Sequence, residues 1–486
     1  MPTADTEVEV LIVGGGPVGL TARALLERWG VRTLLVEKHP ELSPFPRSRL
    51  VNTRSMEIFR QLGIAAEITG NAFPREFGRI RFRDTLHDSD FATAAMVGVN
   101  APISESPVIG VATSQDRLEP TLLAAADAPV RFGVELLDLA EGPESVVARL
   151  VDHQHGGGMR VRARYVLAAD GANSTVRERL GIDTTGPGAM AAVTTVVFDA
   201  DLNTWCADQP AGVYFTAHGS FLPLYPEGGW AWLAPTPEDP DRADWADLVT
   251  RALGPGAAVR ADVLRVQHWV MHAFVAERFG DGRILLAGDA AHALPIIGGL
   301  GMNTGISDVH NLCWKLAGVL RGWAGPGLLD TYATERQPVA HLTLRQAVAN
   351  THLMFQAQSL RQQQLQTGEA APARVELPWS DRYFAQGSYS ASPTAPLPSS
   401  PTALPRPSRP TWARTTSPPR NRATACLTSG SDATARRSTP SANGSPCSPP
   451  TPLAGSSGPP PHGRCASRPL PTSTPDSAAS PPGEHC

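Results

Sequence analysis

The glycine spacing near the amino terminus constrains the fold of this chain more than any other feature. An apolar run from Glu7 to Val13 leads directly into Gly14-Gly15-Gly16-Pro17-Val18-Gly19, and a helical pattern from Leu20 to Trp29 follows. A second apolar run, Thr33 to Val36, ends at the acid Glu37. A Gly-x-Gly-x-x-Gly turn between a strand and a helix lets the backbone approach a pyrophosphate, and the acid accepts hydrogen bonds from a ribose. The sequence therefore predicts an α/β domain with a dinucleotide site, for which FAD and NAD are both candidates.

A second stretch far downstream has a related order of elements. The apolar run Ile284 to Ala287 stops at Gly288-Asp289, a glycine-rich loop follows, and a helical pattern opens near Asn303. The amino-terminal end of a helix carries partial positive charge, so it favours an anion or an electron-rich carbonyl. We therefore expect an acid and a helix terminus beside one bound group, the isoalloxazine of FAD.

Three further features are candidates for the same site. The apolar run Tyr165 to Ala169 ends in Asp170-Gly171, which is either part of the cofactor site or a cap for the helix that begins near Ser174. Gln115 lies at a strand-to-helix junction, where its amide is either a ligand for a ribityl hydroxyl or a helix cap. Arg47 and Arg49 either neutralise a pyrophosphate or are solvated surface charges.

The region from Val193 to Trp269 has a different pattern, in which short strand-like runs alternate with turns and carry many aromatic residues. Such residues either form the core or line a ligand pocket. The candidates for contact with a substrate are Tyr214, Tyr225, Trp232 and Pro295. No Ser-His-Asp arrangement or metal-ligand spacing is visible, so we predict no metal site and assign no catalytic side chain.

Charge and cysteine content limit the partners and the compartment. The net charge is −4, but the last 96 residues hold nine arginines against two aspartates and one glutamate, which leaves −10 for the remainder. An acidic body argues against nucleic acid as a partner. No apolar run reaches the roughly 20 residues of a membrane span, and the pattern of the first ten residues leads us to expect no secretory signal. The body has only Cys206 and Cys313, which is typical of a reduced, cytoplasmic protein.

The carboxy-terminal segment is compositionally unlike the rest. From Ala391 onward there is no valine, isoleucine, phenylalanine, tyrosine or methionine, and 22 of the 46 prolines lie there. Such a segment cannot bury enough apolar surface to offset the entropy of ordering. It is either a disordered tail or the product of a shifted reading frame in a high-GC gene, and we assign it no function.

Taken together, the three glycine-acid stretches resemble the single-component FAD-dependent aromatic hydroxylases, the class A flavoprotein monooxygenases. The segments Pro46 to Arg49, Asn311 to Ala317 and Tyr332 to Pro338 are similar to the phenol and polyketide hydroxylase branch. The resemblance covers about residues 7 to 385.

The resemblance implies a reaction. NADPH, or NADH, reduces FAD, dioxygen adds at the flavin C4a position, and the hydroperoxide transfers oxygen to a small aromatic substrate, a phenol or a polyketide ring. It also implies that Asp289 bonds the ribityl chain and that amides around Leu300 to Asn303 face the flavin N1–C2=O edge. Antibiotic biosynthesis is the expected setting. The alternatives are epoxidation or Baeyer–Villiger chemistry on the same scaffold, or a frameshifted remnant without function.

The resulting expectation is an α/β fold with a discontinuous Rossmann-like FAD-binding domain and an inserted mixed-sheet substrate domain, as a monomer or homodimer. The FAD-binding domain comprises residues 1–75, 101–182 and 276–385, the substrate domain 76–100 and 183–275, and the low-complexity tail 386–486. The predicted cofactor-binding residues are Gly14, Gly16, Pro17, Gly19, Glu37, Lys38, Arg49, Gln115, Asp170, Asp289, Leu300, Gly301, Met302 and Asn303.

Overall fold

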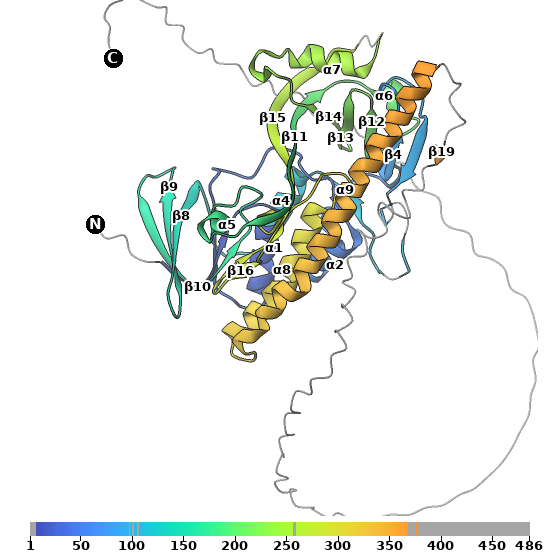
Figure 1. Cartoon of the computed structure of the whole chain (residues 1–486). Helices are drawn as coiled ribbons and strands as arrows, with labels where there is room; N and C mark the ends of the chain where they lie inside the picture. The colour runs from blue at the N-terminus through green and yellow to red at the C-terminus, as the bar shows by residue number, and fades with distance from the viewer. Residues whose placement is uncertain are drawn as a thin grey trace, which may run out of the picture. The chain divides into compact units, whose positions relative to one another are not determined.

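The computed structural model describes residues 6–96, 98–99, 102–104, 106–255, 259–367 and 375–376. The predicted tail, 386–486, lies outside these residues. The described residues form a mixed α/β unit, which confirms the predicted fold class (Figure 1). Its α-helices are α1 (Pro17–Arg28), α2 (Thr53–Gln61), α3 (Ala65–Gly70), α4 (Gln115–Ala124), α5 (Thr175–Arg179), α6 (Asn203–Cys206), α7 (Trp245–Leu253), α8 (Gly301–Leu320) and α9 (Asp330–Thr367). Its 3₁₀ turns are η1 (Arg75–Phe77), η2 (Pro240–Arg242), η3 (Gly288–Ala290) and η4 (Pro326–Leu328).

The first sheet is built around parallel strands in the order β17-β10-β1-β2-β7, with β16 at one edge. The hairpin of β8 and β9 joins it, antiparallel, along β10. Its strands are β1 (Thr6–Val13), β2 (Thr33–Glu37), β7 (Val130–Phe132), β8 (Val134–Glu141), β9 (Val146–Asp152), β10 (Gly158–Ala168), β16 (Gly280–Asp281) and β17 (Ile284–Leu286). The apolar run of β1 is buried on both faces, as expected for a strand at the centre of a parallel sheet.

The register of this sheet brings distant segments together. Val13 pairs with Val36 on one side and with Ala168 on the other, and Ala168 pairs with Leu286. The strands β1, β2, β10 and β17 therefore end at one edge. The segments that follow them, each of which the sequence marks with glycine or an acid, meet at that edge.

The second sheet has the strand order β18-β15-β11-β14-β13-β12-β4-β5-β19 in the described chain. Its strands are β4 (Arg79–Phe82), β5 (Ala92–Ala95), β11 (Thr184–Asp199), β12 (Val213–Thr216), β13 (Gly219–Tyr225), β14 (Gly228–Pro235), β15 (Asp262–Ala276), β18 (His292–Ala293) and β19 (Val375–Glu376). A separate short ladder joins β3 (Leu50–Val51) to β6 (Val111–Ala112). Most strands of the second sheet fall within the predicted substrate segments, 76–100 and 183–275, whereas β18 and β19 lie in the range predicted for the FAD-binding domain, and the predicted domain boundaries stay a prediction.

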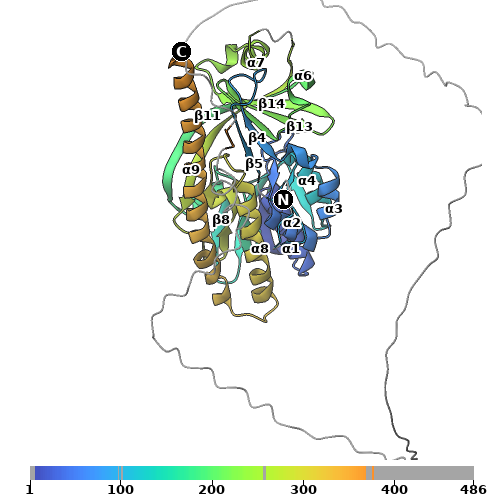
Figure 2. The same cartoon turned by 90° about the vertical axis from the view of Figure 1, so that its right-hand side faces the viewer.

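Helix α9 runs along both sheets, as the two views show (Figures 1 and 2). Near its start, the Tyr332 hydroxyl donates to the Leu286 carbonyl of β17 over 2.7 Å. Toward its end, Arg361 forms an ion pair with Asp84, which follows β4, over 2.7 Å. The helix thus joins the two sheets from one side. None of the helices in the described part combines the length and apolar character that a membrane crossing requires.

Candidate functional site

The amino-terminal glycine turn is shaped by close backbone contacts. The Gly14 amide donates to the Val36 carbonyl over 2.8 Å, and Gly14 has a φ of +108°. A Cβ at Gly19 would lie 2.0 Å from the Gly14 carbonyl oxygen, so helix α1 can approach this turn only through a glycine. A Cβ at Gly16 would meet nothing within 4 Å, because Gly16 borders a cavity. Space therefore remains at the start of α1, where helix amides have no acceptor within the helix.

Glu37, at the end of β2, is oriented by the backbone around it. Its Oε2 accepts from the Gly15 amide over 2.6 Å, and its Oε1 accepts from the His39 amide over 3.0 Å. The carboxylate lines the cavity beside the glycine turn, as does the neighbouring Lys38. This is where the sequence places a ribose.

Asp170 lines the cavity and also caps α5. Its carboxylate accepts from the Ser174 hydroxyl over 2.6 Å and from the Val176 amide over 3.1 Å. Burial raises the pKa of Asp170, and the bond from Ser174 partly offsets this. The nearby Arg177 guanidinium donates to the Ala290 carbonyl over 3.0 Å. The Asp170 turn is therefore fixed to the η3 turn that holds Asp289.

Asp289 extends into the cavity beside the amino terminus of α8. A Cβ at Gly301 would lie 3.7 Å from Asp289 Oδ1, so the carboxylate is close to the first residue of the helix. Among the described residues, the Asp289 side chain has no hydrogen-bond partner. The side chain is exposed toward the cavity, but the protein that surrounds it raises its pKa, an effect that the charges of His292 and Arg47 oppose. An unpaired carboxylate next to free helix amides is an arrangement that a ligand with both donors and acceptors would satisfy.

Asn303 has a different role from its neighbours in α8. Its Oδ1 accepts from the Asn52 amide over 2.9 Å and from the Ser55 hydroxyl over 2.7 Å. Its Nδ2 donates to the carbonyls of Leu50 and Gly299, over 2.8 and 2.7 Å. The side chain is thus engaged in joining α8 to α2 and to the glycine loop. Only its backbone amide, in the first turn of α8, remains for a cofactor.

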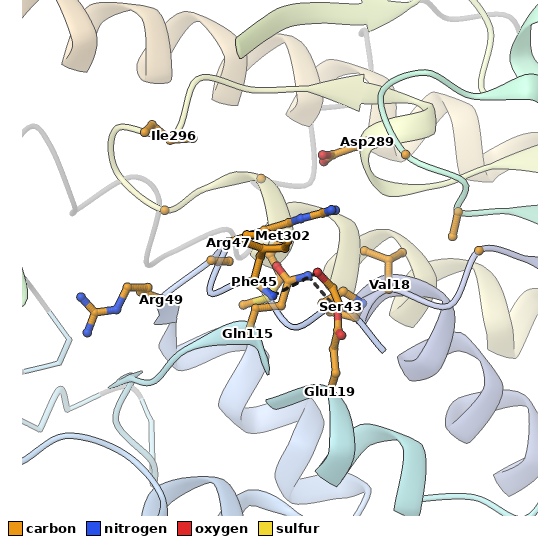
Figure 3. Close-up of a pocket in the computed structure, with 18 of the residues that line it drawn as sticks. Val18, Ser43, Phe45, Arg47, Arg49, Gln115, Glu119, Asp289, Ile296 and Met302 are labelled. Atoms are coloured by element: carbon orange, nitrogen blue, oxygen red, sulfur yellow. Dashed lines mark hydrogen bonds between the residues drawn. The ribbon is translucent and has the colours of Figure 1, made fainter. Parts of the chain in front are cut away.

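Gln115 opens α4 on the opposite side of the cavity from Asp289 (Figure 3). Its Nε2 donates to Glu119 Oε1 over 2.7 Å, while Glu119 Oε2 is buried without a partner in the described chain. Burial raises the pKa of Glu119 to about 7, against the lowering effect of the bond from Gln115. The Gln115 amide is therefore oriented by a neighbour and still has acceptor capacity toward the cavity.

The two arginines after β2 point in different directions. The Arg49 side chain extends away from Asp289 (Figure 3) and donates to the Gly212 carbonyl over 2.9 Å. Its guanidinium lies 5.1 Å from the centre of the Phe73 ring, and burial lowers its pKa to about 10. Arg47 borders the cavity closely enough for its charge to act on Asp289. The contact of Arg49 with a pyrophosphate stays a prediction.

These residues surround one cavity of about 670 Å³, within the range of ligand and cofactor sites. It is lined by Gly14, Gly16, Pro17, Glu37, Lys38, Arg49, Gln115, Asp170, Asp289, Pro295, Leu300, Gly301 and Met302. Two helix termini and an unpaired carboxylate face it, and Gly16 leaves room for a phosphate. The residues present therefore fit FAD. Across the described ranges, no group of His, Cys, Asp or Glu side chains is arranged to hold a metal.

The aromatic residues proposed to line a substrate pocket lie elsewhere, and the pleat of the second sheet explains why. Tyr214 is 1% exposed and Trp232 is 6% exposed, in a cluster that packs beneath α7. Tyr225 is bonded to Asp116, at the start of α4. Successive residues of a strand face opposite sides. The cavity is bordered instead by the neighbours of these aromatics, Val213, Phe215 and Leu233.

Some lining residues carry no motif and were missed from the sequence. Ser43 and Phe45, between β2 and β3, border the cavity close to Gln115 (Figure 3). Residues 134–136, at the start of β8, border it near Glu37. Neither segment has a spacing that signals binding. Ser43 and Phe45 follow the parallel strand β2, and residues 134–136 follow β7, which pairs in parallel with β2.

Comparison with known proteins identifies the FAD binding domain family, whose sequence pattern matches residues 7–347. Aklavinone 12-hydroxylase DnrF of Streptomyces peucetius is 37% identical over 376 residues, which cover 72% of this chain and 75% of that protein. A 4-methyl-5-nitrocatechol 5-monooxygenase of a Burkholderia species is 35% identical over 367 residues, which cover 71% of this chain and 66% of that protein.

Solved structures give the same assignment of the fold. The flavin-dependent monooxygenase PieE, in complex with FAD and substrate, superimposes with a TM-score of 0.68 and 37% identity. The match covers 73% of this chain and 65% of PieE. The chain thus matches about two thirds to three quarters of the length of these relatives.

Proposed function

This chain belongs to the FAD binding domain family that includes flavin-dependent aromatic hydroxylases, and we propose that it hydroxylates a multi-ring phenol or polyketide with NAD(P)H and dioxygen. FAD is the cofactor of the cavity described above. The observation that carries the proposal is that this cavity continues, without a break, from the glycine turn at Gly16 to the apolar face of the second sheet at Leu233. A flavin held at the first part would face a ring held at the second.

The residues of the first sheet would hold FAD at several points. Glu37 would accept from a ribose hydroxyl, and the amides at the start of α1 would bind the pyrophosphate. Gln115 and Asp289 would bond the ribityl chain from opposite sides. The free amides of Gly301 to Asn303 would face the electron-rich edge of the flavin ring. When bound and reduced, FAD supplies the oxygen chemistry, and the protein's part is to orient the substrate and exclude water.

The substrate wall follows from the register of the second sheet. Phe215 pairs with Ser220, Ser220 with Leu233, Leu233 with Thr195, and Thr195 with Gln267. Residues paired in this way share one face of a sheet. The wall is therefore apolar at Phe215 and Leu233 and polar at Ser220, Thr195 and Gln267. The Thr195 hydroxyl accepts from Trp269 Nε1 over 3.0 Å, whereas the side chains of Ser220 and Gln267 have no hydrogen-bond partner among the described residues.

The spacing of these polar residues supports a large substrate. Ser220 and Gln267 are three strands apart, which corresponds to about 14 Å. A single phenol ring is too short to reach both, whereas a molecule with several fused rings and oxygen atoms at both ends can. The loop residues Pro295, Ile296 and Ile297 border the same cavity and would add apolar contacts. Ile296 is 42% exposed, as expected for an apolar side chain that extends into the cavity.

The setting of the reaction is also part of the proposal. We place the enzyme in the cytoplasm, as a monomer or homodimer, with no nucleic-acid or membrane partner. The support is the acidic body and the buried, unpaired thiols of Cys206 and Cys313. NADPH is the proposed electron donor. With no second Gly-x-Gly-x-x-Gly in the sequence, it would bind transiently rather than in a domain of its own.

The test uses the purified full-length chain. Bound flavin is measured by absorbance, and NADPH and NADH oxidation is followed with phenol, 1,8-dihydroxyanthraquinone and aklavinone. We expect bound FAD, and faster oxidation with hydroxylated product for the three-ring and four-ring compounds. A folded chain that binds no flavin contradicts the proposed function. Phenol turnover that equals or exceeds that of the larger compounds contradicts the proposed substrate class.

A further inference from the structure

A buried charge network lies directly beneath the turn that carries Asp289. Asp308, on α8, is 0% exposed. Its Oδ2 lies 2.6 Å from His292 Nε2 and accepts from the Gly288 amide over 3.2 Å. Its Oδ1 accepts from Arg336 Nε, on α9, over 2.7 Å. Because a carboxylate only accepts hydrogen bonds, the Nε2 of His292 carries the proton.

The network fixes elements that are far apart in the sequence. Arg336 also donates to the Thr304 carbonyl, in the first turns of α8, over 3.3 Å. A Cβ at Gly305 would lie 2.9 Å from Gly288 Cα, so α8 packs directly on the η3 turn. Asp308 therefore connects the η3 turn, β18, α8 and α9 at one point. Moving its carboxylate would change the position of the Asp289 turn relative to the start of α8.

A purely structural role is the alternative, and the second sheet offers a comparison. Asp90 is also buried and is bound by two arginines, Arg81 and Arg83. It lies in the connection between β4 and β5 of the second sheet and does not border the cavity. Asp308 differs because it bonds Gly288, the residue immediately before Asp289. The charges of His292 and Arg336 hold the pKa of Asp308 below its usual value although burial raises it, so the carboxylate is ionised.

We propose that Asp308 is a positioning residue for the flavin. It holds the Gly288-Asp289 turn against α8, so that the Asp289 carboxylate and the free amides of α8 contact the same cofactor. Arg336 makes α9 part of this arrangement without bordering the cavity itself. The inference rests on the proposed function only in that FAD must bind.

The experiment compares Asp308→Asn with Asp90→Asn in the full-length chain. Each variant removes the charge of one buried carboxylate that contacts two basic side chains, which are His292 and Arg336 for Asp308 and the two arginines for Asp90. We measure the melting temperature, the dissociation constant for FAD by flavin fluorescence, and the flavin reduction potential. For Asp308→Asn we expect FAD affinity to fall at least about tenfold, because small displacements of binding groups have large effects, together with a shifted potential. For Asp90→Asn we expect lower stability with unchanged FAD affinity and potential.

Arg336→Lys is the second variant, in case Asp308→Asn does not fold. It keeps the positive charge but loses the planar donor pair that joins Asp308 to the Thr304 carbonyl. We expect a smaller loss of FAD affinity and a potential shifted in the same direction. Unchanged affinity and potential in a folded variant at either position overturn the proposal, as does an equal loss of affinity in Asp90→Asn. Absence of FAD from the unaltered chain contradicts the proposed function instead.

Discussion

The three glycines of the first turn have separate physical roles, and this separation gives a sharp prediction. Gly19 is required for packing, because a Cβ there would lie 2.0 Å from the Gly14 carbonyl oxygen. Gly16 is not required by the protein itself, because a Cβ there would meet nothing within 4 Å. We expect Gly16→Ala to fold normally but to bind FAD at least about tenfold more weakly, because the methyl group occupies space next to the phosphates.

Gly19→Ala is the matched variant, with the same added methyl group three residues later. We expect it to lower the melting temperature strongly or to prevent folding, since backbone atoms cannot move away as a side chain can. Thermal unfolding and FAD titration of both variants check the prediction. Equal effects of the two substitutions on stability would show that the turn does not distinguish these positions.

Glu119 leads to a prediction about pH. Its pKa in the folded protein is about 7, above the ordinary value of a glutamate, because the carboxyl is buried. Because the pKa of Glu119 is higher in the folded protein than in the unfolded chain, the stabilising contribution of this carboxyl is fully present below about pH 4.5. That contribution is lost as the pH rises through 7. The free energy of unfolding should therefore fall by up to about 3 kcal/mol from this group across that window.

Glu119→Gln removes the titrating group while keeping a side chain of similar size and an acceptor for Gln115. Denaturant unfolding of both proteins with excess FAD, between pH 5 and 8, measures the effect. We expect the variant to lose less stability than the unaltered protein over this range. If the free energy of unfolding falls equally with pH in the two proteins, the pH dependence does not come from Glu119.

At the scale of elements, the strands of the second sheet could be predicted from the sequence, but the faces they present could not. Tyr214 and Trp232 were the expected substrate contacts, and their neighbours Phe215 and Leu233 border the cavity instead. A sheet with one face in water shows alternating polar and apolar residues. In β12, β13 and β14 apolar residues lie on both faces, because one face packs beneath α7 and the other borders the cavity, so the pattern does not distinguish the two faces.

Substitutions at Leu233 and Trp232 test this assignment of faces. Leu233→Trp would fill the cavity, and we expect loss of substrate binding with FAD binding retained. Trp232→Ala would leave a void beneath α7, and we expect a loss of stability of about 3–5 kcal/mol with little effect on substrate affinity. Spectral titration of the bound flavin with 1,8-dihydroxyanthraquinone and thermal unfolding measure both. The reverse pattern would show that Trp232 faces the substrate.

The glycine turns that border the cavity were more predictable than the face of the second sheet that borders it, and the reason is physical. Glycine turns such as Gly14 to Gly19 impose backbone requirements that few residue types satisfy, so they are visible in sequence. The interactions of Asn303 and Arg49 were not visible, because their partners, such as the Asn52 amide and the Gly212 carbonyl, are backbone groups far away in the sequence. Backbone groups have no residue-specific signal.

For the molecule as a whole, α9 has a larger role than its sequence suggests. Tyr332 and Arg336, near its start, contact Leu286 and Asp308 beneath the cavity. The segment 386–486, by contrast, has the composition of a chain that cannot form a core. We therefore expect a chain that ends after residue 385 to retain FAD binding and its melting temperature.

A chain that ends after Leu329 is the companion to this truncation, because it lacks all of α9. We expect it to yield no folded flavoprotein. Flavin content after gel filtration and circular dichroism distinguish the two products. If the chain that ends after residue 385 fails to bind FAD, the low-complexity segment contributes to the fold, and our assignment of no function to it is wrong.

The connection between Arg336 and the Asp289 turn also sets an order of events during synthesis. The ribosome produces the glycine turn within the first 19 residues, but the turn at Asp289 and its support from α9 come some 300 residues later. At roughly 5–20 residues per second, this interval lasts roughly 15–60 s. During that time the nascent chain has only the adenine half of its site and cannot retain FAD. Flavin loading is therefore expected to be a late, nearly post-translational step.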